Sequence, residues 1–210
     1  MRSQRPDGLV FDLDGTLWDA AAATTEGWNS ALADMGADGR VTADCVRSVS
    51  GTPFVECIET LLPRLYPPTE AVLERLERSE RRAIERIGGT LYEGVAEGLA
   101  MLASCYRLFV VSNCPSWYLE AFLRTSGVGG CFSGWDCHGA SGIPKAGMLA
   151  NLVSRYRLGH AVYIGDTQGD QDAAHAAGME FAFARYGFGV VASPLWSFDS
   201  FNDLVEELLS

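Results

Sequence analysis

Four acidic side chains stand at the ends of apolar runs, where they could do chemistry. Asp12 and Asp14 flank Leu13 at the end of one run, Asp166 ends a second run, and Asp170 follows four residues later. Two carboxylates so close together at the end of a buried strand are electrostatically costly without a cation. Mg²⁺ suits such acids, because it accepts carboxylate oxygens and keeps positions for water and a phosphate. The pattern therefore predicts a magnesium site.

Two further positions could bind an anion. Ser112 and Asn113 end a third apolar run and could donate hydrogen bonds to phosphate oxygens, together with the backbone of the helix that follows. Lys145 is the only lysine among 16 basic residues, the others being arginine. An ammonium is a compact point charge, unlike the planar guanidinium. Each signal is weak alone, but together and in this order they favour a phosphate site.

The elements that position these residues follow from the apolar runs. Strands are predicted at 8–13, 107–113 and 160–166, with weaker ones at 131–135 and 180–185. Helical patterns lie between or after them, at 95–102, 117–125, 146–156 and 170–177. Strands that alternate with helices predict an α/β fold with a Rossmann-like parallel sheet. In such sheets the ligand site forms at the carboxyl ends of the strands, where the polar residues stand.

A run of successive helices interrupts this alternation between residues 18 and 92. The predicted helices are 25–35, 42–49, 54–62 and 69–87. We predict a helical cap at 18–92, inserted in a catalytic core of 1–17 and 93–210, with Gly88 and Gly89 as the flexible link back to the sheet. The charged run 74–86 (ERLERSERRAIER) is interpreted as a solvated helix face.

Composition limits the partners. The chain has 210 residues, 48% of them hydrophobic, and a net charge of −11. This charge argues against nucleic acid or an anionic membrane as a partner. The N-terminus lacks a secretory signal and no run of about 18 apolar residues occurs, which predicts a cytoplasmic protein. An anionic substrate would need a local cation.

The cysteines suggest neither a zinc site nor a disulfide framework, because they are scattered and form no CxxC pair. We expect plain buried thiols at all six positions: Cys45, Cys57, Cys105, Cys114, Cys131 and Cys137.

Four segments together resemble the motifs of the haloacid dehalogenase superfamily. They are residues 11–17 (FDLDGTL), 110–113 (VVSN), Lys145, and 163–170 (YIGDTQGD). The resemblance is to the helical-cap, phosphoglycolate phosphatase-like subgroup. It implies the sheet order 3-2-1-4-5 and a cap between the first two motifs, where the helical insertion is predicted.

The resemblance also implies roles for single residues. They are Asp12 as nucleophile, Asp14 as general acid and base, Ser112 as phosphate ligand and Lys145 as charge neutraliser. The implied metal ligands are Asp12, the Asp14 carbonyl and Asp166, with Asp170 supporting them. The implied phosphate- and substrate-binding residues are Ser112, Asn113 and Lys145, with Gly51 and Thr52 in the cap loop.

Two positions depart from the subgroup. Residues 146–148 (AGM) replace a Pro-rich continuation, and Gly169 stands where Asn is frequent. Neither departure removes a catalytic group, but both leave the exact subfamily open.

The function expected from this resemblance is a Mg²⁺-dependent phosphatase that acts on a small phosphorylated metabolite through an aspartyl-phosphate, as a monomer or homodimer. A phosphoglycolate-like substrate is one candidate. A β-phosphoglucomutase-like phosphomutase is a less favoured alternative, because Thr24 stands where those mutases carry His. A non-enzymatic, phospho-accepting receiver-type domain and a catalytically silent binding protein are the alternatives from other classes.

Overall fold

A six-stranded parallel sheet forms the centre of the molecule in the computed structural model, which describes residues 5–210. The strand order is β5-β4-β1-β6-β7-β8. Their bounds are β1 Gly8–Phe11, β4 Arg107–Ser112, β5 Phe132–Cys137, β6 Ala161–Gly165, β7 Glu180–Ala184 and β8 Ser197–Phe198. The first five strands have the order 3-2-1-4-5 that the family resemblance implied. The α/β, Rossmann-like fold class is confirmed.

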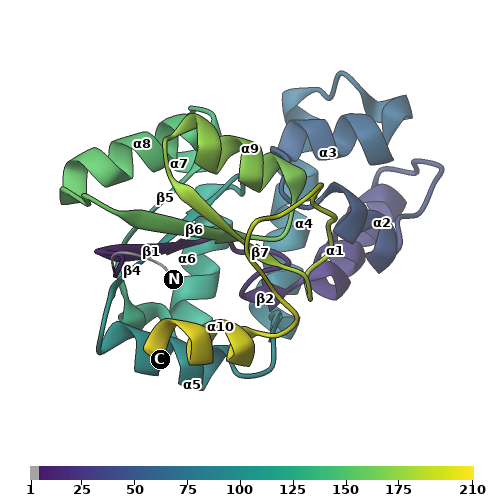
Figure 1. The fold of residues 1–210 in the computed structure, drawn as a ribbon. Helices are drawn as coiled ribbons and strands as arrows, with labels where there is room; N and C mark the ends of the chain where they lie inside the picture. Colours follow the sequence, from purple (N-terminus) through teal and green to yellow (C-terminus); the bar gives the residue numbers. More distant parts are fainter. Residues whose placement is uncertain (1–4) are drawn as a thin grey trace.

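Helices cover both faces of this sheet (Figure 1). The helices α8 (Lys145–Tyr156) and α9 (Gln168–Ala176) lie on one face, and the short α7 (His138–Ser141) precedes them. The opposite face is covered by α5 (Val95–Ala103), α6 (Ser116–Thr125) and α10 (Phe201–Leu209). Because helices cover both faces, every residue of β1 and β6 is buried.

The helical insertion packs around its own apolar cluster. Its helices are α1 (Ala21–Asp34), α2 (Ala43–Val49), α3 (Phe54–Leu61) and α4 (Glu70–Ile87), with a 3₁₀ turn at Pro63–Leu65. Trp28, Leu32, Ile58 and Leu76 are buried in this cluster. We use the name cap for these four helices. The domain bounds at residues 18 and 92 stay a prediction.

A short antiparallel pair, absent from the predicted elements, joins the two ends of the insertion. In it β2 (Trp18–Asp19) pairs with β3 (Thr90–Leu91). Gly89 lies against the Trp18 ring, and a Cβ there would come within 2.6 Å of a ring carbon. Trp18 in turn packs edge-on against Phe122 of α6, with ring centroids 5.0 Å apart. Close packing as well as flexibility therefore calls for glycine at this joint.

The sequence patterns did not predict the C-terminal elements or two short ones. The strand β8 has two residues and α7 has four, too few to show a hydrophobic period. The 3₁₀ turn Gly129–Cys131 is shorter still. For α10 a signal existed, because the Ser200 side chain caps the helix by accepting a hydrogen bond from the Asp203 amide. Among residues 5–210, no helix is long and apolar enough to cross a membrane.

The six cysteines are free thiols, but the expectation that all of them are buried was wrong. Cys137 is buried, whereas Cys45 and Cys105 are exposed.

Candidate active site

The carboxyl ends of three adjacent strands bring the predicted site residues together. Asp12 follows β1, Ser112 ends β4 and Asp166 follows β6, and β1 lies between the other two strands. The Asp12 amide donates a hydrogen bond of 2.8 Å to the Ile164 carbonyl, which fixes the chain at the start of the loop. Asp12, Ser112 and Asp166 are all buried. Parallel strands in register therefore place side chains more than 150 residues apart in one site.

Lys145 connects two of the acids. It is the first residue of α8, and its side chain is 5% exposed. Its Nζ lies 2.9 Å from Asp12 Oδ1 and 2.6 Å from Asp170 Oδ1. Burial lowers the pKa of Lys145, but the two carboxylates outweigh it and raise that pKa above its usual value. The lysine is therefore a fixed positive charge beside Asp12.

Asp170 is held by the start of α9. It forms a capping box with Thr167, in which the Thr167 hydroxyl accepts from the Asp170 amide and the Asp170 carboxylate accepts from the Thr167 amide. The Thr167 hydroxyl, at 2.7 Å, and the Asp166 amide, at 3.2 Å, are also within hydrogen-bond distance of Asp170 Oδ2. Because Lys145 occupies Oδ1, both oxygens of Asp170 already have protein partners. Asp170 is therefore suited to holding the neighbouring site residues in place.

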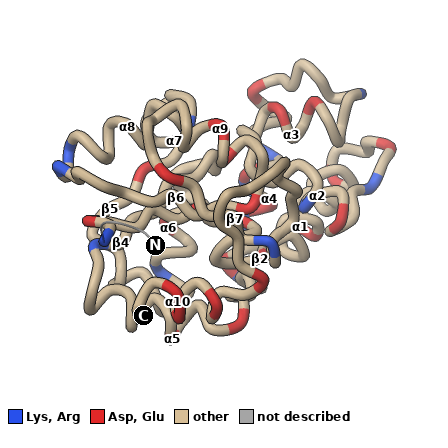
Figure 2. Tube along the Cα trace, viewed as in Figure 1, with Lys and Arg blue, Asp and Glu red and all other residues tan. Residues whose placement is uncertain are grey.

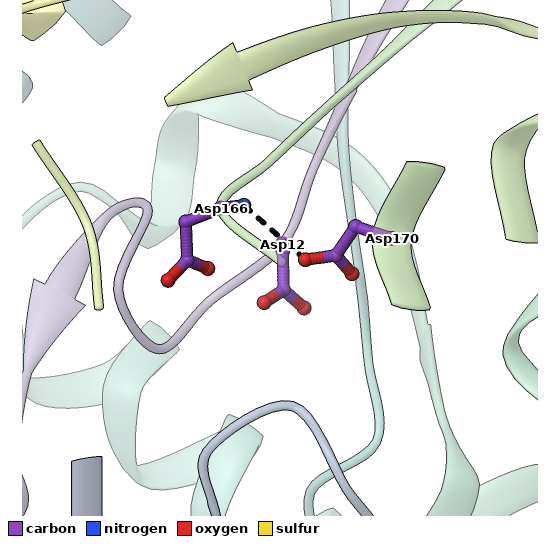
Figure 3. A group of neighbouring side chains, drawn as sticks. All are labelled: Asp12, Asp166 and Asp170. Atoms are coloured by element: carbon purple, nitrogen blue, oxygen red, sulfur yellow. Dashed lines mark hydrogen bonds between the residues drawn. The ribbon is translucent and has the colours of Figure 1, made fainter. Parts of the chain in front are cut away.

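Asp12, Asp166 and Asp170 form the acidic group of the site (Figure 3). One oxygen from each carboxylate lies within 4.8 Å of the others. Burial raises the pKa of Asp12 to about 6, with Lys145 opposing and Asp170 adding to the rise. Burial, then Asp12 and Asp170, raises the pKa of Asp166 to about 8. One lysine thus leaves negative charge unbalanced, and the all-oxygen donor set fits a hard cation such as Mg²⁺.

Backbone donors and glycines fix Asp166. Its Oδ2 accepts from the amides of Phe188 at 2.8 Å and Gly189 at 3.2 Å. Gly15 and Gly187 pass so close that a Cβ at either position would collide with the Asp166 side chain. Gly15 also has a φ of +83°, which favours glycine. The loop after β7 therefore holds this carboxylate in one orientation.

The Asp14 carboxylate lies apart from the acidic group and has a different partner. Its Oδ1 accepts a 2.6 Å hydrogen bond from the Tyr118 hydroxyl. Burial raises the pKa of Asp14 to about 7, although the Tyr118 hydrogen bond lowers it. A carboxyl group with this pKa can donate or accept a proton near neutral pH. The Asp14 carbonyl as a metal ligand stays a prediction.

A cavity lies between the strand ends and the cap. The predicted site residues among its lining are Asp14, Gly51, Thr52, Ser112 and Asn113. Asn113 Nδ2 donates a 2.8 Å hydrogen bond to the Gly51 carbonyl and so ties the sheet to the cap loop. The Asn113 amide therefore already has a partner in the cap loop. The phosphate-binding role of Asn113 stays a prediction.

Sequence reasoning missed two tyrosines and one cap acid. Tyr118 orients Asp14, and the Tyr163 hydroxyl lies 3.0 Å from the Val111 carbonyl and 3.3 Å from Asp12 Oδ1. A polar tip inside the apolar run 160–166 was the available signal for Tyr163. Glu80 lies in the run 74–86, which was interpreted as solvated, yet it is only 5% exposed and lines the cavity. For Glu80 that interpretation was wrong, because α4 turns one of its charged residues toward α1.

Known proteins resemble the chain over most of its length. Residues 9–184 match the family described as haloacid dehalogenase-like hydrolase. The chain is 28% identical over 235 residues to a phosphoglycolate phosphatase of Colwellia psychrerythraea, with 99% of each chain covered. It is 28% identical over 209 residues to one of Synechococcus elongatus, covering 94% of this chain and 95% of the other.

Solved structures agree in fold. A protein described as a predicted phosphoglycolate phosphatase from Haemophilus somnus is 24% identical, with a TM-score of 0.83 over 98% of this chain and 99% of the other. A predicted phosphatase from Clostridium acetobutylicum is 19% identical, with a TM-score of 0.80 over 98% and 99%. At this identity the likeness supports the fold alone.

We predict that Lys145→Arg lowers kcat for p-nitrophenyl phosphate on the order of a hundredfold, comparable to the loss of one preorganised donor. The space between Asp12 and Asp170 fits an ammonium, whereas a planar guanidinium would displace one of the carboxylates. The matched control is Arg155→Lys, an exposed exchange in the opposite direction on the same helix, which should leave kcat unchanged. Near-normal turnover by folded Lys145→Arg would remove this lysine from the site.

Proposed function

The chain belongs to the haloacid dehalogenase-like hydrolase family and is, like its relatives, a phosphatase, and from this premise we propose that it hydrolyses a small phosphate monoester through a phosphoryl group carried on Asp12. The observation that carries this proposal is the buried Asp12 carboxylate, which pairs with Lys145. Two residues after Asp12, the carboxyl group of Asp14 has a pKa raised to about 7. The family match confirms the predicted resemblance and enzyme class. The match also argues against the receiver-type alternative, because it is to a family of hydrolases.

Asp12 and Asp166 would hold Mg²⁺, with Asp170 supporting them. This assignment is supported by the buried acidic group and by the charge that Lys145 leaves unbalanced. When bound, Mg²⁺ would supply positive charge that stabilises the oxygens of the transferred phosphoryl group.

In the first step, an oxygen of the Asp12 carboxylate attacks phosphorus and the bond from phosphorus to the ester oxygen breaks. Lys145 offsets the repulsion between the Asp12 carboxylate and the phosphate dianion. Asp14 donates its proton to the leaving alkoxide, which departs as an alcohol. Asp14 lines the cavity, so its carboxyl group is within the space where the leaving group would lie.

In the second step, water attacks the phosphorus of the aspartyl-phosphate. The Asp14 carboxylate, now without its proton, accepts one from the water, and the bond between phosphorus and Asp12 breaks to release phosphate. Ser112 ends β4 and lines the cavity, which supports a role in binding a phosphoryl oxygen. The contact between Asn113 and Gly51 would keep the cap closed over the site and limit access of bulk water.

Phosphoglycolate, named in the descriptions of the relatives, is the first natural compound to test. Thr24 stands where the mutases carry His, and its hydroxyl donates to Glu80, which supports hydrolysis over phosphomutase chemistry. A cytoplasmic location and a monomeric or dimeric state stay predictions.

We predict that hydrolysis of p-nitrophenyl phosphate stops in excess EDTA and returns with excess Mg²⁺. Asp166→Asn should raise the Mg²⁺ concentration for half-maximal rate by at least about tenfold, because it removes a proposed ligand. Asp172→Asn, an exposed change on the same helix as Asp170, is the control and should not alter it. Full activity in EDTA would contradict the metal requirement.

We predict that Tyr118→Phe shifts the alkaline limb of the pH profile of kcat/KM to higher pH, by up to about one unit. The Tyr118 hydroxyl stabilises the charged form of Asp14, so its removal raises the pKa of Asp14 further above about 7. The proton donor is then kept to higher pH. The substrate should be an alkyl phosphate, whose alkoxide needs that proton.

Tyr66→Phe is the control for this profile, because Tyr66 is exposed in the cap. It should leave the alkaline limb in place. An unmoved limb in Tyr118→Phe, or one shifted to lower pH, would show that Asp14 is not the proton donor.

A further inference from the structure

Glu80 is a buried carboxylate that the proposed mechanism does not use. It comes from α4 and lines the same cavity as Asp14. Its Oε1 accepts from the Thr24 hydroxyl at 2.8 Å, and its Oε2 accepts from the Trp28 indole at 2.9 Å. Neither partner carries a charge. A carboxylate oxygen can accept more than one hydrogen bond, so both oxygens keep capacity for a further donor.

The cavity offers no positive charge to a ligand. Within the described chain, none of the residues that line it is Lys, Arg or His, whereas two are acids. Lys145 is bound to Asp12 and Asp170 at the phosphoryl end. The acidic character extends beyond the cavity, since the net charge is −11 and Figure 2 shows Asp and Glu over both the cap and the sheet. A leaving group with a carboxylate would therefore meet repulsion.

Arg47 lies near the cavity wall, and carboxylates already pair with its positive charge. Its guanidinium lies over the ring of Phe188, which lines the cavity, with 5.9 Å to the ring centroid. Two carboxylates hold its nitrogens, Asp19 at 2.8 Å and Asp44 at 2.8 Å. To bind an anionic ligand, Arg47 would have to give up one of these ion pairs.

Aromatic rings complete the surroundings of Glu80. Trp28 and Phe54 line the cavity and pack edge to face, with ring centroids 5.6 Å apart. Tyr118 and Phe188 line the same cavity. Aromatic faces attract cations through the ring quadrupole, and a desolvated carboxylate gains most from a cationic partner. A carboxylate among aromatic rings is therefore suited to an ammonium group.

Burial and the acidic side chains of the cavity shift the pKa values of its titratable groups. Burial raises the pKa of Glu80 to about 7. Burial also raises the pKa of the Cys57 thiol to about 11, and the negative charges of Glu80 and Asp14 add to this rise. No positively charged side chain of residues 5–210 stabilises the ionised form of Glu80. A cation that entered the cavity would stabilise it.

We propose that the cavity selects a leaving group that carries an ammonium group, so that the substrate is the phosphate monoester of a small amino alcohol, with Glu80 as the residue that recognises the cation. This inference rests on the proposed phosphatase function. It favours substrates with a cationic leaving group over esters such as phosphoglycolate, whose leaving group is anionic.

Glu80 also has a structural contact that a test must separate. It joins α4 to α1 through Thr24 and Trp28, and Gly27 lies against its backbone, where a Cβ would come within 2.5 Å of the Glu80 Cα. Loss of a merely structural role would weaken turnover of all esters alike. Loss of cation recognition would weaken turnover of the ammonium ester selectively.

The experiment compares three esters with leaving groups of similar length and different charge: 2-aminoethyl phosphate, 2-hydroxyethyl phosphate and phosphoglycolate. The kcat/KM of each is measured with Mg²⁺ for the wild type, for Glu80→Gln and for the control Glu74→Gln, with p-nitrophenyl phosphate as the activity reference. Glu74 is exposed on the same helix. Thermal unfolding checks that each variant is folded.

The wild type should prefer the 2-aminoethyl ester over phosphoglycolate by at least about tenfold, the size of one well-placed charge interaction. Glu80→Gln should lower kcat/KM for the ammonium ester about tenfold and leave the hydroxyl ester within about threefold. Glu74→Gln should change neither. Should Glu80→Gln not fold, the wild-type order of the three esters decides by itself.

Three results would overturn the inference while leaving the phosphatase function intact: a wild-type preference for phosphoglycolate, turnover of p-nitrophenyl phosphate without discrimination among the three esters, or an equal loss for all esters in folded Glu80→Gln. Failure to hydrolyse any of the four compounds with Mg²⁺ would instead overturn the proposed function, and the inference with it.

Discussion

The ion pairs of buried Lys145 with Asp12 and Asp170 are the interaction on which the rest of the site depends. Burial makes each of these charges costly, and their mutual contacts, at 2.9 and 2.6 Å, are the ion pairs that offset that cost. The parallel sheet brings Asp12 to its edge, α8 begins at the lysine, and the capping box of α9 fixes Asp170. Removal of any of these supports would leave an unpaired charge in the interior. The fold therefore fixes the geometry of the nucleophile.

The phosphoryl end and the leaving-group end of the site differ in charge. At the phosphoryl end, Lys145 and the proposed Mg²⁺ would offset the acids and the substrate dianion. At the leaving-group end, the described residues offer Asp14, Glu80 and aromatic rings without a cation. The cap supplies Glu80 and two of these rings, and the hydrogen bond from Asn113 to Gly51 joins it to the sheet. One fold can thus keep the chemistry constant at the strand ends while cap residues set which alcohol leaves.

The part of the site that could be predicted from sequence is the part built from strand ends. Asp12, Ser112 and Asp166 each follow or end an apolar run, and parallel topology then brings them together. Lys145 was identifiable because the chain uses arginine at every other basic position. The hydrogen bond from Tyr118 to Asp14 depends on how α6 packs, and the burial of Glu80 depends on how α4 packs against α1. Such tertiary contacts leave no periodic signal, and a charged run conceals the one acid that faces inward.

The central claim is that Asp12 carries the phosphoryl group during turnover. It is tested most directly by mixing the enzyme with Mg²⁺ and excess p-nitrophenyl phosphate, quenching with acid during steady turnover, and locating the phosphoryl group by peptide mass spectrometry. We predict a phosphorylated peptide with the group on Asp12, which disappears when the substrate is exhausted and is absent from folded Asp12→Asn. Turnover by the wild type with no phosphoryl group on Asp12, or with the group on another residue, would contradict the account.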